Sequence, residues 1–128
     1  MNTVIVTAAV IERENTFLLT RRQKGAHLEG LWEFPGGKCD GHETLPACLA
    51  RELREELAVD AAIGDEIFTV THTYEDRRVE LHFFACRLAA EPQPQLGQEM
   101  RWVPRAKLAS LEFPDADAEL IEMLLINA

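Results

Sequence analysis

Cysteine, long apolar runs and basic leader segments are scarce in this chain. Only three of its 128 residues are cysteines, Cys39, Cys48 and Cys86, and none forms a Cys-x-x-Cys pair. This spacing suggests neither a disulfide framework nor a zinc site, so we expect reduced, partly buried thiols. The longest uncharged stretches, 3–11 and 67–74, are far shorter than the roughly 20 residues that cross a bilayer. We therefore expect no membrane partner.

Basic residues are also few relative to acidic ones. Thirteen Lys and Arg residues stand against 22 Asp and Glu residues, which gives a formal net charge of −9. A protein that binds a nucleic-acid polymer normally carries a basic stripe that releases counterions, so we expect no such partner. A small anionic ligand would have to arrive with metal ions or meet a few local arginines. Because the first residues form no basic targeting segment, we predict a cytoplasmic protein.

The length fits one domain over residues 1–128, as a monomer or a homodimer. Apolar runs predict strands over 3–11, 17–20, 63–74, 78–88 and 99–104. Helical spacing predicts two helices, over about 45–57 and 115–126. Strands interrupted by two helices are typical of a layered α/β or α+β domain.

The helix predicted over 45–57 carries three crowded carboxylates. On a helical wheel, Leu49, Leu53 and Leu57 form one apolar stripe, and Glu52, Glu55 and Glu56 share an arc of about 100° beside it. Like charges at this spacing repel one another, whereas a hard divalent cation would turn the repulsion into ligation. The alternative is a charged surface helix cross-linked by pairs such as Arg51 with Glu55.

Two glycines precede this helix. Gly36 and Gly37 follow Pro35, and their lack of a side chain allows the backbone to approach a ligand closely. Such a loop can offer a carbonyl to a metal or amides to a phosphate, although a plain turn has the same sequence.

Residues 37–59 carry a longer spaced pattern. It resembles the signature of the Nudix hydrolases, Gly-x5-Glu-x7-Arg-Glu-U-x-Glu-Glu-x-Gly-U, where U is a bulky aliphatic residue. The matching positions are Gly37, Glu43, Arg51, Glu52, Leu53, Glu55, Glu56 and Val59. Ala58 departs from the pattern, because the signature has glycine there. That position often adopts a left-handed conformation, which costs a residue with Cβ about 1 kcal/mol but leaves the carboxylates intact.

The resemblance implies a fold and an activity. The segments 21–22, 30–35 and 101–103 are similar to the branch that contains MutT and the (deoxy)CTP pyrophosphohydrolases. The implied fold is an α/β/α sandwich, α/β (α+β) in class, with a mixed central sheet, the motif helix on one face and the C-terminal helix on the other. The implied reaction is Mg²⁺-dependent hydrolysis of a nucleoside triphosphate to a monophosphate and pyrophosphate, with Mn²⁺ as a substitute metal.

The resemblance also assigns roles around the metal. The expected metal ligands are the carboxylates of Glu52, Glu55 and Glu56 and the backbone carbonyl of Gly36, and a triphosphate would be repelled by these acids without cations between them. Glu99 is either a further ligand or base, or a solvated loop acid. Glu43 is expected to support the metal ligands from behind. Arg51 is expected to contribute to catalysis by orienting a glutamate.

Three cations and one glycine are candidates for binding the phosphates. Arg22 and Lys38 would contact them, unless either is an ordinary surface cation. Arg77 is similar to a substrate-contacting arginine of MutT, and Gly37 belongs to the glycine loop.

Three further residues are candidates for recognising the base. His27 and Phe34 resemble nucleotide-contacting positions of MutT, although Phe34 is equally suited to the core. An asparagine of MutT that reads oxidised guanine matches Asp117. An ionised aspartate only accepts hydrogen bonds and would favour an amino donor such as N4 of cytosine, whereas a protonated one would mimic the amide. Alternatively, Asp117 caps the last helix.

The leading hypothesis is an enzyme that removes modified nucleotides, such as 8-oxo-dGTP or (d)CTP-type triphosphates, from the pool used in DNA replication and repair. One alternative is a Nudix hydrolase of another nucleoside diphosphate derivative. The other is a non-catalytic nucleotide-binding module, which the complete set of motif carboxylates disfavours.

Overall fold

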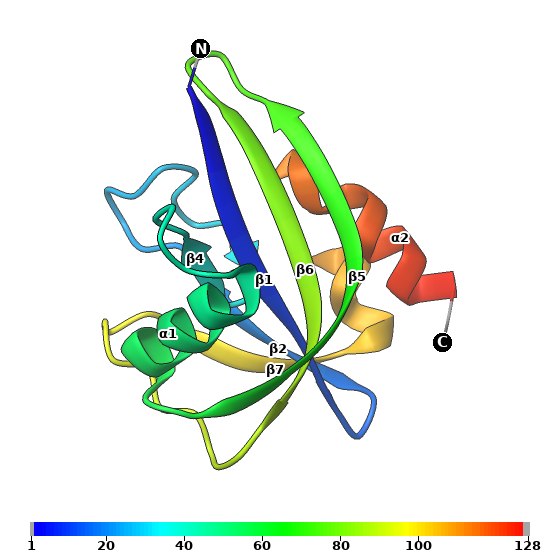
Figure 1. Cartoon of the computed structure of the whole chain (residues 1–128). Helices are drawn as coiled ribbons and strands as arrows, with labels where there is room; N and C mark the ends of the chain where they lie inside the picture. The colour runs from blue at the N-terminus through cyan, green and yellow to red at the C-terminus, as the bar shows by residue number, and fades with distance from the viewer. Residues whose placement is uncertain (1, 127–128) are drawn as a thin grey trace.

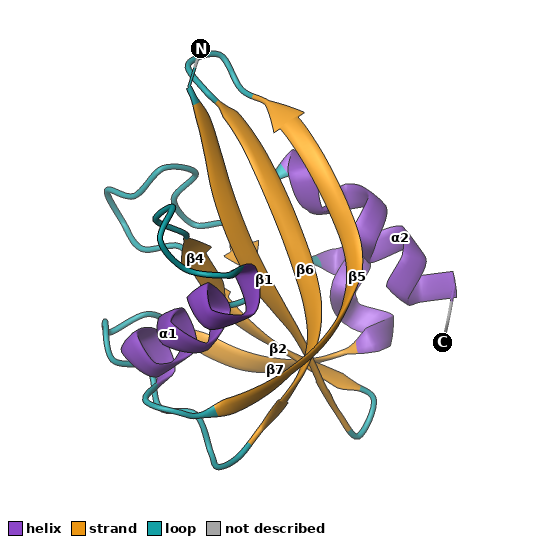
Figure 2. Ribbon diagram, viewed as in Figure 1, coloured by secondary structure: helices purple, strands orange, loops and turns teal. Residues whose placement is uncertain are grey.

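The computed structural model describes residues 2–126 as a twisted mixed sheet with helices on both faces (Figures 1 and 2). The elements in chain order are β1 (Thr3–Arg13), β2 (Thr16–Arg21), β3 (Trp32–Glu33), β4 (Gly36–Lys38), α1 (Leu45–Leu57), β5 (Ala61–Thr73), β6 (Arg78–Leu88), β7 (Met100–Pro104), the 3₁₀ helices η1 (Arg105–Ser110) and η2 (Asp115–Asp117), and α2 (Ala118–Ile126). None of the helices among residues 2–126 has the length and apolar character to cross a membrane.

Strand β1 is the centre of the sheet. It runs parallel to β6 and antiparallel to β4, where Ala8 lies opposite Gly36. Its far end forms a hairpin with β2, which in turn pairs with β3 and β7. The strand order is therefore β3-β2-β1-β6-β5, and the predicted mixed sheet is confirmed.

The two helices cover opposite faces of this sheet (Figure 1). On one side, Leu49, Leu53 and Leu57 of α1 are fully buried against the sheet, which confirms the apolar stripe. On the other side, α2 packs Leu120 and Leu124 into a separate core cluster. Burial of this kind is the main stabilising contribution to a sandwich of two helices and a sheet.

Local interactions fix both ends of α1 at the predicted residues. The Thr44 side chain accepts a hydrogen bond from the Ala47 amide at 3.2 Å, which caps the first turn. Ala58 ends the helix in the left-handed conformation, with φ 51° and ψ 41°, and its amide donates to the Arg54 carbonyl. The conformation expected at this position is confirmed, with alanine in place of the usual glycine.

Several features differ from the sequence predictions. Residues 115–117, predicted as the first turn of the last helix, form η2 instead. The short strands β3 and β4 and the helix η1 were not predicted, because two or three residues show no periodicity and their pairing partners lie far away in the sequence. The predicted strands over 3–11, 17–20, 63–74, 78–88 and 99–104 are all present, with ends shifted by up to two residues.

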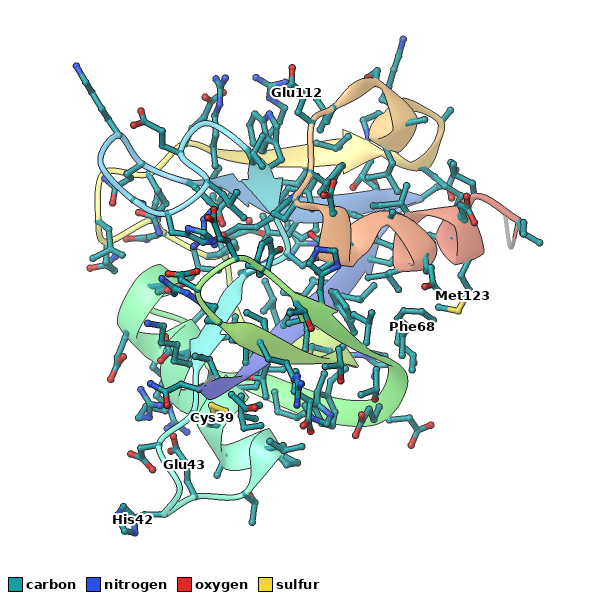
Figure 3. The ribbon with its side chains drawn as sticks, turned by 90° about the horizontal axis from the view of Figure 1, so that it is seen from above. Cys39, His42, Glu43, Phe68, Glu112 and Met123 are labelled. Atoms are coloured by element: carbon teal, nitrogen blue, oxygen red, sulfur yellow. A yellow bond between two sulfur atoms is a disulfide. The ribbon has the colours of Figure 1, made fainter. Side chains whose placement is uncertain are left out.

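The expectation of three reduced cysteines is wrong. Cys39 and Cys48 form a disulfide, with their Cα atoms 5.5 Å apart, and Cys86 is free. The chain folds back over residues 40–44, which brings the end of β4 against the first turns of α1; a separation of nine residues in sequence gives no sign of this. Figure 3 shows Cys39 beside the loop that carries His42 and Glu43.

Candidate active site

The glycine loop and α1 touch each other at a carboxylate. A Cβ atom added to Gly37 would lie 2.3 Å from Glu52 Oε2, and one added to Gly36 would lie 2.0 Å from the Thr7 carbonyl oxygen. A side chain at Gly36 would collide with backbone and is excluded, whereas a side chain at Gly37 would force the Glu52 carboxylate to move. The backbone of β4 is thereby held directly over the acidic face of the helix.

Arg51 organises that acidic face. Its Nη2 donates to Glu43 Oε1 at 2.6 Å, and its Nη1 donates to Glu52 Oε1 at 3.0 Å and to Glu55 Oε2 at 3.2 Å. Nη2 also donates to the Lys38 carbonyl at 3.3 Å, which connects α1 to β4. The hydrogen bonds that Arg51 donates to Glu43, and to Glu52 and Glu55, raise the pKa of Arg51, so the guanidinium stays charged. Arg51 therefore fixes carboxylates in place, as expected of a residue that orients a glutamate.

Glu52 and Glu56 are crowded and desolvated. Burial raises the pKa of Glu52, although Arg51 opposes the shift. Burial, together with the charges of Glu52 and Glu33, raises the pKa of Glu56 to about 8, although the Gly36 amide donates a hydrogen bond to it. Carboxylates destabilised by one another's charge form an oxygen-rich donor set that a hard divalent cation would relieve. The residues present therefore fit such a cation.

Glu55 and Glu99 do not join this pair. Glu55 is more than half exposed and bonded to Arg51, and Glu99 pairs with Arg21 and Arg101. Neither carboxylate lines the cavity that Glu52 and Glu56 share or the one beside it. Across residues 2–126, no group of three or more Asp, Glu, His or Cys side chains surrounds a common point as a metal site would. Of the four predicted acidic ligands, Glu52 and Glu56 therefore lie together at a cavity, whereas Glu55 and Glu99 are engaged by arginines.

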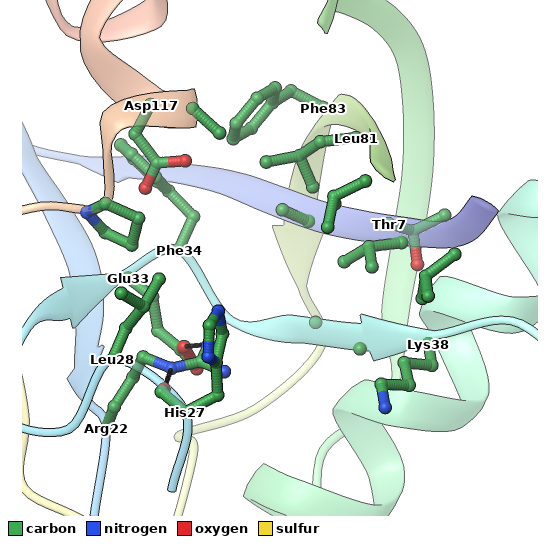
Figure 4. A pocket seen from close by; sticks show the side chains of 18 of the residues that line it. Thr7, Arg22, His27, Leu28, Glu33, Phe34, Lys38, Leu81, Phe83 and Asp117 are labelled. Atoms are coloured by element: carbon green, nitrogen blue, oxygen red, sulfur yellow. Dashed lines mark hydrogen bonds and ion pairs between the residues drawn. The ribbon is translucent and has the colours of Figure 1, made fainter. Parts of the chain in front are cut away.

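Two adjoining cavities lie beside these carboxylates. The first, of about 160 Å³, is lined mainly by apolar side chains of β1 and β6 and by Asp117 (Figure 4). The second, of about 380 Å³, is lined by Glu52, Glu56 and Gln98 among others. The residues common to both are Arg22, Glu33, Gly36, Gly37 and Lys38. All seven residues predicted to bind substrate line the first cavity, namely Arg22, His27, Phe34, Gly37, Lys38, Arg77 and Asp117.

Asp117 is the most unusual group of the first cavity. It is 4% exposed, and its carboxylate accepts no hydrogen bond from the part of the chain that the structure describes. Burial, with a contribution from the charge of Glu33, raises its pKa to about 7. Within residues 2–126 no backbone amide donates to the Asp117 carboxylate, so the interpretation of Asp117 as a helix cap is not supported. A buried polar group without a protein partner is free to bind a ligand.

Comparisons with known proteins agree with this geometry. Residues 6–123 match the NUDIX domain. The chain belongs to the Nudix family. It is 39% identical to the CTP pyrophosphohydrolase of Escherichia coli (strain K12) over 98% of this chain and 93% of that protein. It is 34% identical to the 8-oxo-dGTP diphosphatase of Haemophilus influenzae (strain ATCC 51907 / DSM 11121 / KW20 / Rd) over 94% of this chain and 90% of that protein.

A solved structure gives the same result for the fold. The MutT protein from Methanosarcina mazei Go1 superposes with a TM-score of 0.87 at 27% identity, over 98% of this chain and 95% of that one. The resemblance of the sequence to the MutT branch of Nudix hydrolases, and the sandwich fold that it implied, are therefore confirmed.

Three other residues of this Nudix domain that are predicted to bind substrate, Phe34, Lys38 and Arg77, differ in the contacts they make. Phe34 lines the cavity and also packs against Phe83 and Phe113, each with ring centroids 5.9 Å away, so it serves the core as well. Lys38 is exposed and forms no ion pair with any residue in the range 2–126. Arg77 pairs with its neighbour Asp76 at 3.2 Å.

Sequence reasoning missed two residues of the Nudix site. Tyr74 lines the first cavity, with its ring 5.5 Å from that of His27. Glu33 borders both cavities and pairs with Arg22, whose Nε donates to the His27 carbonyl. The sequence signal for Glu33 is its place in the segment 30–35. Its contact with Arg22 depends on the pairing of β3 with β2, which sets Glu33 opposite Thr20, two residues before Arg22.

Proposed function

We propose that this protein is a Mg²⁺-dependent pyrophosphohydrolase that converts a nucleoside triphosphate to its monophosphate and pyrophosphate, with Mn²⁺ as a substitute metal. The observation that carries the proposal is the continuity of the two cavities. An apolar cavity that ends at an unpartnered carboxylate suits a nucleobase, and the adjoining cavity brings the phosphates to Glu52 and Glu56. The names of the relatives support the same substrate class.

The acidic residues of α1 and the glycine loop are suited to hold the metal. Nudix hydrolases generally use divalent metal ions. Glu52 and Glu56 would provide the main carboxylates, with the Gly36 carbonyl beside them and Glu55 or Glu99 available if their arginine pairs are exchanged. When bound, the cation offsets phosphate charge and lowers the pKa of a water molecule.

Other side chains of the protein would position the carboxylates and bind the phosphates. Glu43 holds Arg51, and Arg51 keeps Glu52 in place against Gly37. Lys38 lines both cavities and, within residues 2–126, forms no ion pair, so it is available to the phosphates. Such preorganised charges act without reorganisation during the reaction, which is why positioning residues matter for turnover.

Base selection is assigned to Asp117. With a pKa of about 7, its ionised and protonated forms coexist near neutral pH. The ionised form accepts from an amino group such as N4 of cytosine, and the protonated form also donates, as an amide does. This dual character suits both (d)CTP-type triphosphates and 8-oxo-dGTP, the two substrate types in the names of the relatives.

An enzyme of this kind would clear modified nucleotides from the cytoplasmic pool before DNA replication and so support DNA repair. It would act on free nucleotides, as a monomer or a homodimer, with neither a nucleic-acid polymer nor a membrane as partner. The acidic net charge of −9 favours such small, metal-bound substrates over polymers.

A substrate panel tests the proposal. CTP, dCTP, 5-methyl-dCTP, dGTP and 8-oxo-dGTP are compared by kcat/KM in Mg²⁺, and the products are separated by anion-exchange chromatography. We expect a monophosphate and pyrophosphate, with cytosine nucleotides or 8-oxo-dGTP leading. Release of inorganic phosphate as the first product, or no hydrolysis of any triphosphate, would overturn the proposal.

A further inference from the structure

A disulfide joins the two segments that form the candidate metal site. Cys39 directly follows β4, whose glycines contact Glu52 and Glu56. Cys48 lies on α1 one helical turn before Glu52, because a separation of four residues returns to the same side of a helix. The bridge therefore ties the glycine loop covalently to the helix that carries the acidic residues.

The loop that the disulfide closes has few other attachments. It projects from the body of the protein (Figure 3), and a Cβ atom added to Gly41 would meet no atom within 4 Å. Among the hydrogen bonds of residues 40–44 within the described chain, only those between Glu43 and Arg51 reach beyond this loop. Arg51 also donates to Glu52. The placement of Glu43, and through Arg51 that of Glu52, thus depends on the closure of the loop.

The two sulfur atoms differ in their surroundings. Cys39 is half-buried, whereas Cys48 is 0% exposed and its Sγ lies 3.4 Å from the Thr7 hydroxyl oxygen. Arg51 Nη2 lies 4.0 Å from Cys48 Sγ, so a negative charge on this sulfur has a guanidinium beside it. An attacking thiolate therefore reaches Cys39 Sγ more easily, and Cys48 Sγ is the better leaving group.

We infer that Cys39 and Cys48 are a reversible redox site, which takes dithiols as reductants and hydrogen peroxide as oxidant, and that their bridge keeps Arg51 and Glu52 in place for the metal. The inference rests on the proposed function in assigning Mg²⁺ to Glu52. In reduction, a thiolate of the dithiol bonds to Cys39 Sγ, the S–S bond breaks, and its electron pair leaves on Cys48 Sγ, which takes up a proton. The second thiol of the reductant then displaces Cys39 as a thiol, and the reductant becomes a cyclic disulfide.

In oxidation, the Cys39 thiolate attacks one oxygen of hydrogen peroxide, the O–O bond breaks, and a sulfenic acid and one water form. The Cys48 thiol then attacks the Cys39 sulfur and a second water leaves, so two thiols and one peroxide give one disulfide and two waters. Disulfides in a reducing compartment, such as the cytoplasm proposed above, are usually transient and redox-sensing. A bridge that closes under oxidants suits an enzyme proposed to remove oxidised nucleotides.

The test compares the wild type treated with hydrogen peroxide and the wild type reduced by dithiothreitol, each freed of its reagent. Alkylation after unfolding, followed by mass spectrometry, should count one free thiol in the first and three in the second. Without metal, the Ala47 and Cys48 amides, which donate to Thr44, should exchange hydrogen at least about 10-fold faster in the reduced protein. Reduction should also lower the Mg²⁺ affinity, measured by calorimetry, and the kcat with dCTP by about 10-fold each. Hydrogen peroxide should restore both.

Two variants provide matched controls. Cys39→Ser cannot form the bridge and should stay at the level of the reduced wild type after either treatment. Cys86→Ser should respond to both treatments as the wild type does. Burial raises the pKa of the Cys86 thiol to about 12, so this cysteine is a poor target for the oxidant.

Equal amide exchange and equal Mg²⁺ affinity in the two forms, with the thiol counts verified, would overturn the inference. A bridge that dithiothreitol opens and hydrogen peroxide does not close would overturn it as well. If Cys39→Ser does not fold, the two forms of the wild type decide alone. Absence of hydrolysis of every triphosphate in both forms refutes the proposed function instead, because thiol counts and amide exchange are measured without substrate.

Discussion

The buried carboxylate of Asp117 should make the stability of the protein depend on pH in a way that one substitution removes. Burial raises its pKa from 3.8 to about 7 in the folded state. Below pH 4 the group is protonated in both the folded and the unfolded chain, so it costs nothing. Between pH 4 and 7 the unfolded chain ionises and the folded one does not, so the stability falls as the pH rises. At about 1.4 kcal/mol per pH unit, the loss reaches about 4 kcal/mol above pH 7.

Asp117→Asn cannot ionise and should escape this loss. The free energy of unfolding of the variant minus that of the wild type should therefore rise by about 3 to 4 kcal/mol between pH 4 and pH 8 and then become constant. Urea denaturation of both proteins at each pH measures it, and other groups that titrate in both proteins largely cancel in the difference. A difference that does not change with pH would refute the reasoning, because it would mean that Asp117 ionises in the folded protein as easily as in water.

Three other perturbations follow from the same geometry. Asp117→Asn should also shift the ranking of kcat/KM values from cytosine nucleotides towards 8-oxo-dGTP, and an unchanged ranking would remove Asp117 from base recognition. Gly37→Ala places a Cβ atom 2.3 Å from Glu52 Oε2, so kcat should fall by about 10-fold or more while thermal unfolding shifts only slightly; wild-type turnover would contradict the close contact. Reduction of the Cys39–Cys48 bridge with dithiothreitol should lower the free energy of unfolding by about 2.5 kcal/mol, as estimated for a loop closed across a separation of nine residues. Cys86→Ser serves as its control, since loss of this free thiol should leave that difference unchanged.

Prediction from the sequence was most accurate for features that depend on interactions between residues close together in the chain. Helix α1 begins and ends at the predicted residues because Thr44 caps one end and the left-handed Ala58 closes the other. The long strands were predictable because their apolar residues form continuous runs. The motif likewise located Glu52 and Glu56, since their place on one helix face follows from helical periodicity.

Features that depend on distant segments were not predictable in this way. The disulfide, the short strands β3 and β4 and the position of Glu33 beside Arg22 all require knowledge of which segments lie side by side. The same is true of the arginine partners of Glu55 and Glu99, which are Arg51 for the first and Arg21 and Arg101 for the second. Side-chain direction in a charged cluster depends on its partners, and residue spacing does not contain that information.

Binding of Mg²⁺ at α1, measured together with turnover, tests the central claim most directly. Isothermal titration calorimetry and initial rates with dCTP are compared for the wild type, Glu52→Gln, Glu56→Gln and the exposed control Glu122→Gln. Both motif variants should keep the fold by circular dichroism, bind Mg²⁺ at least about 10-fold more weakly and lose about 100-fold or more in kcat, whereas Glu122→Gln should match the wild type. Undiminished metal binding and turnover in both motif variants would contradict the account.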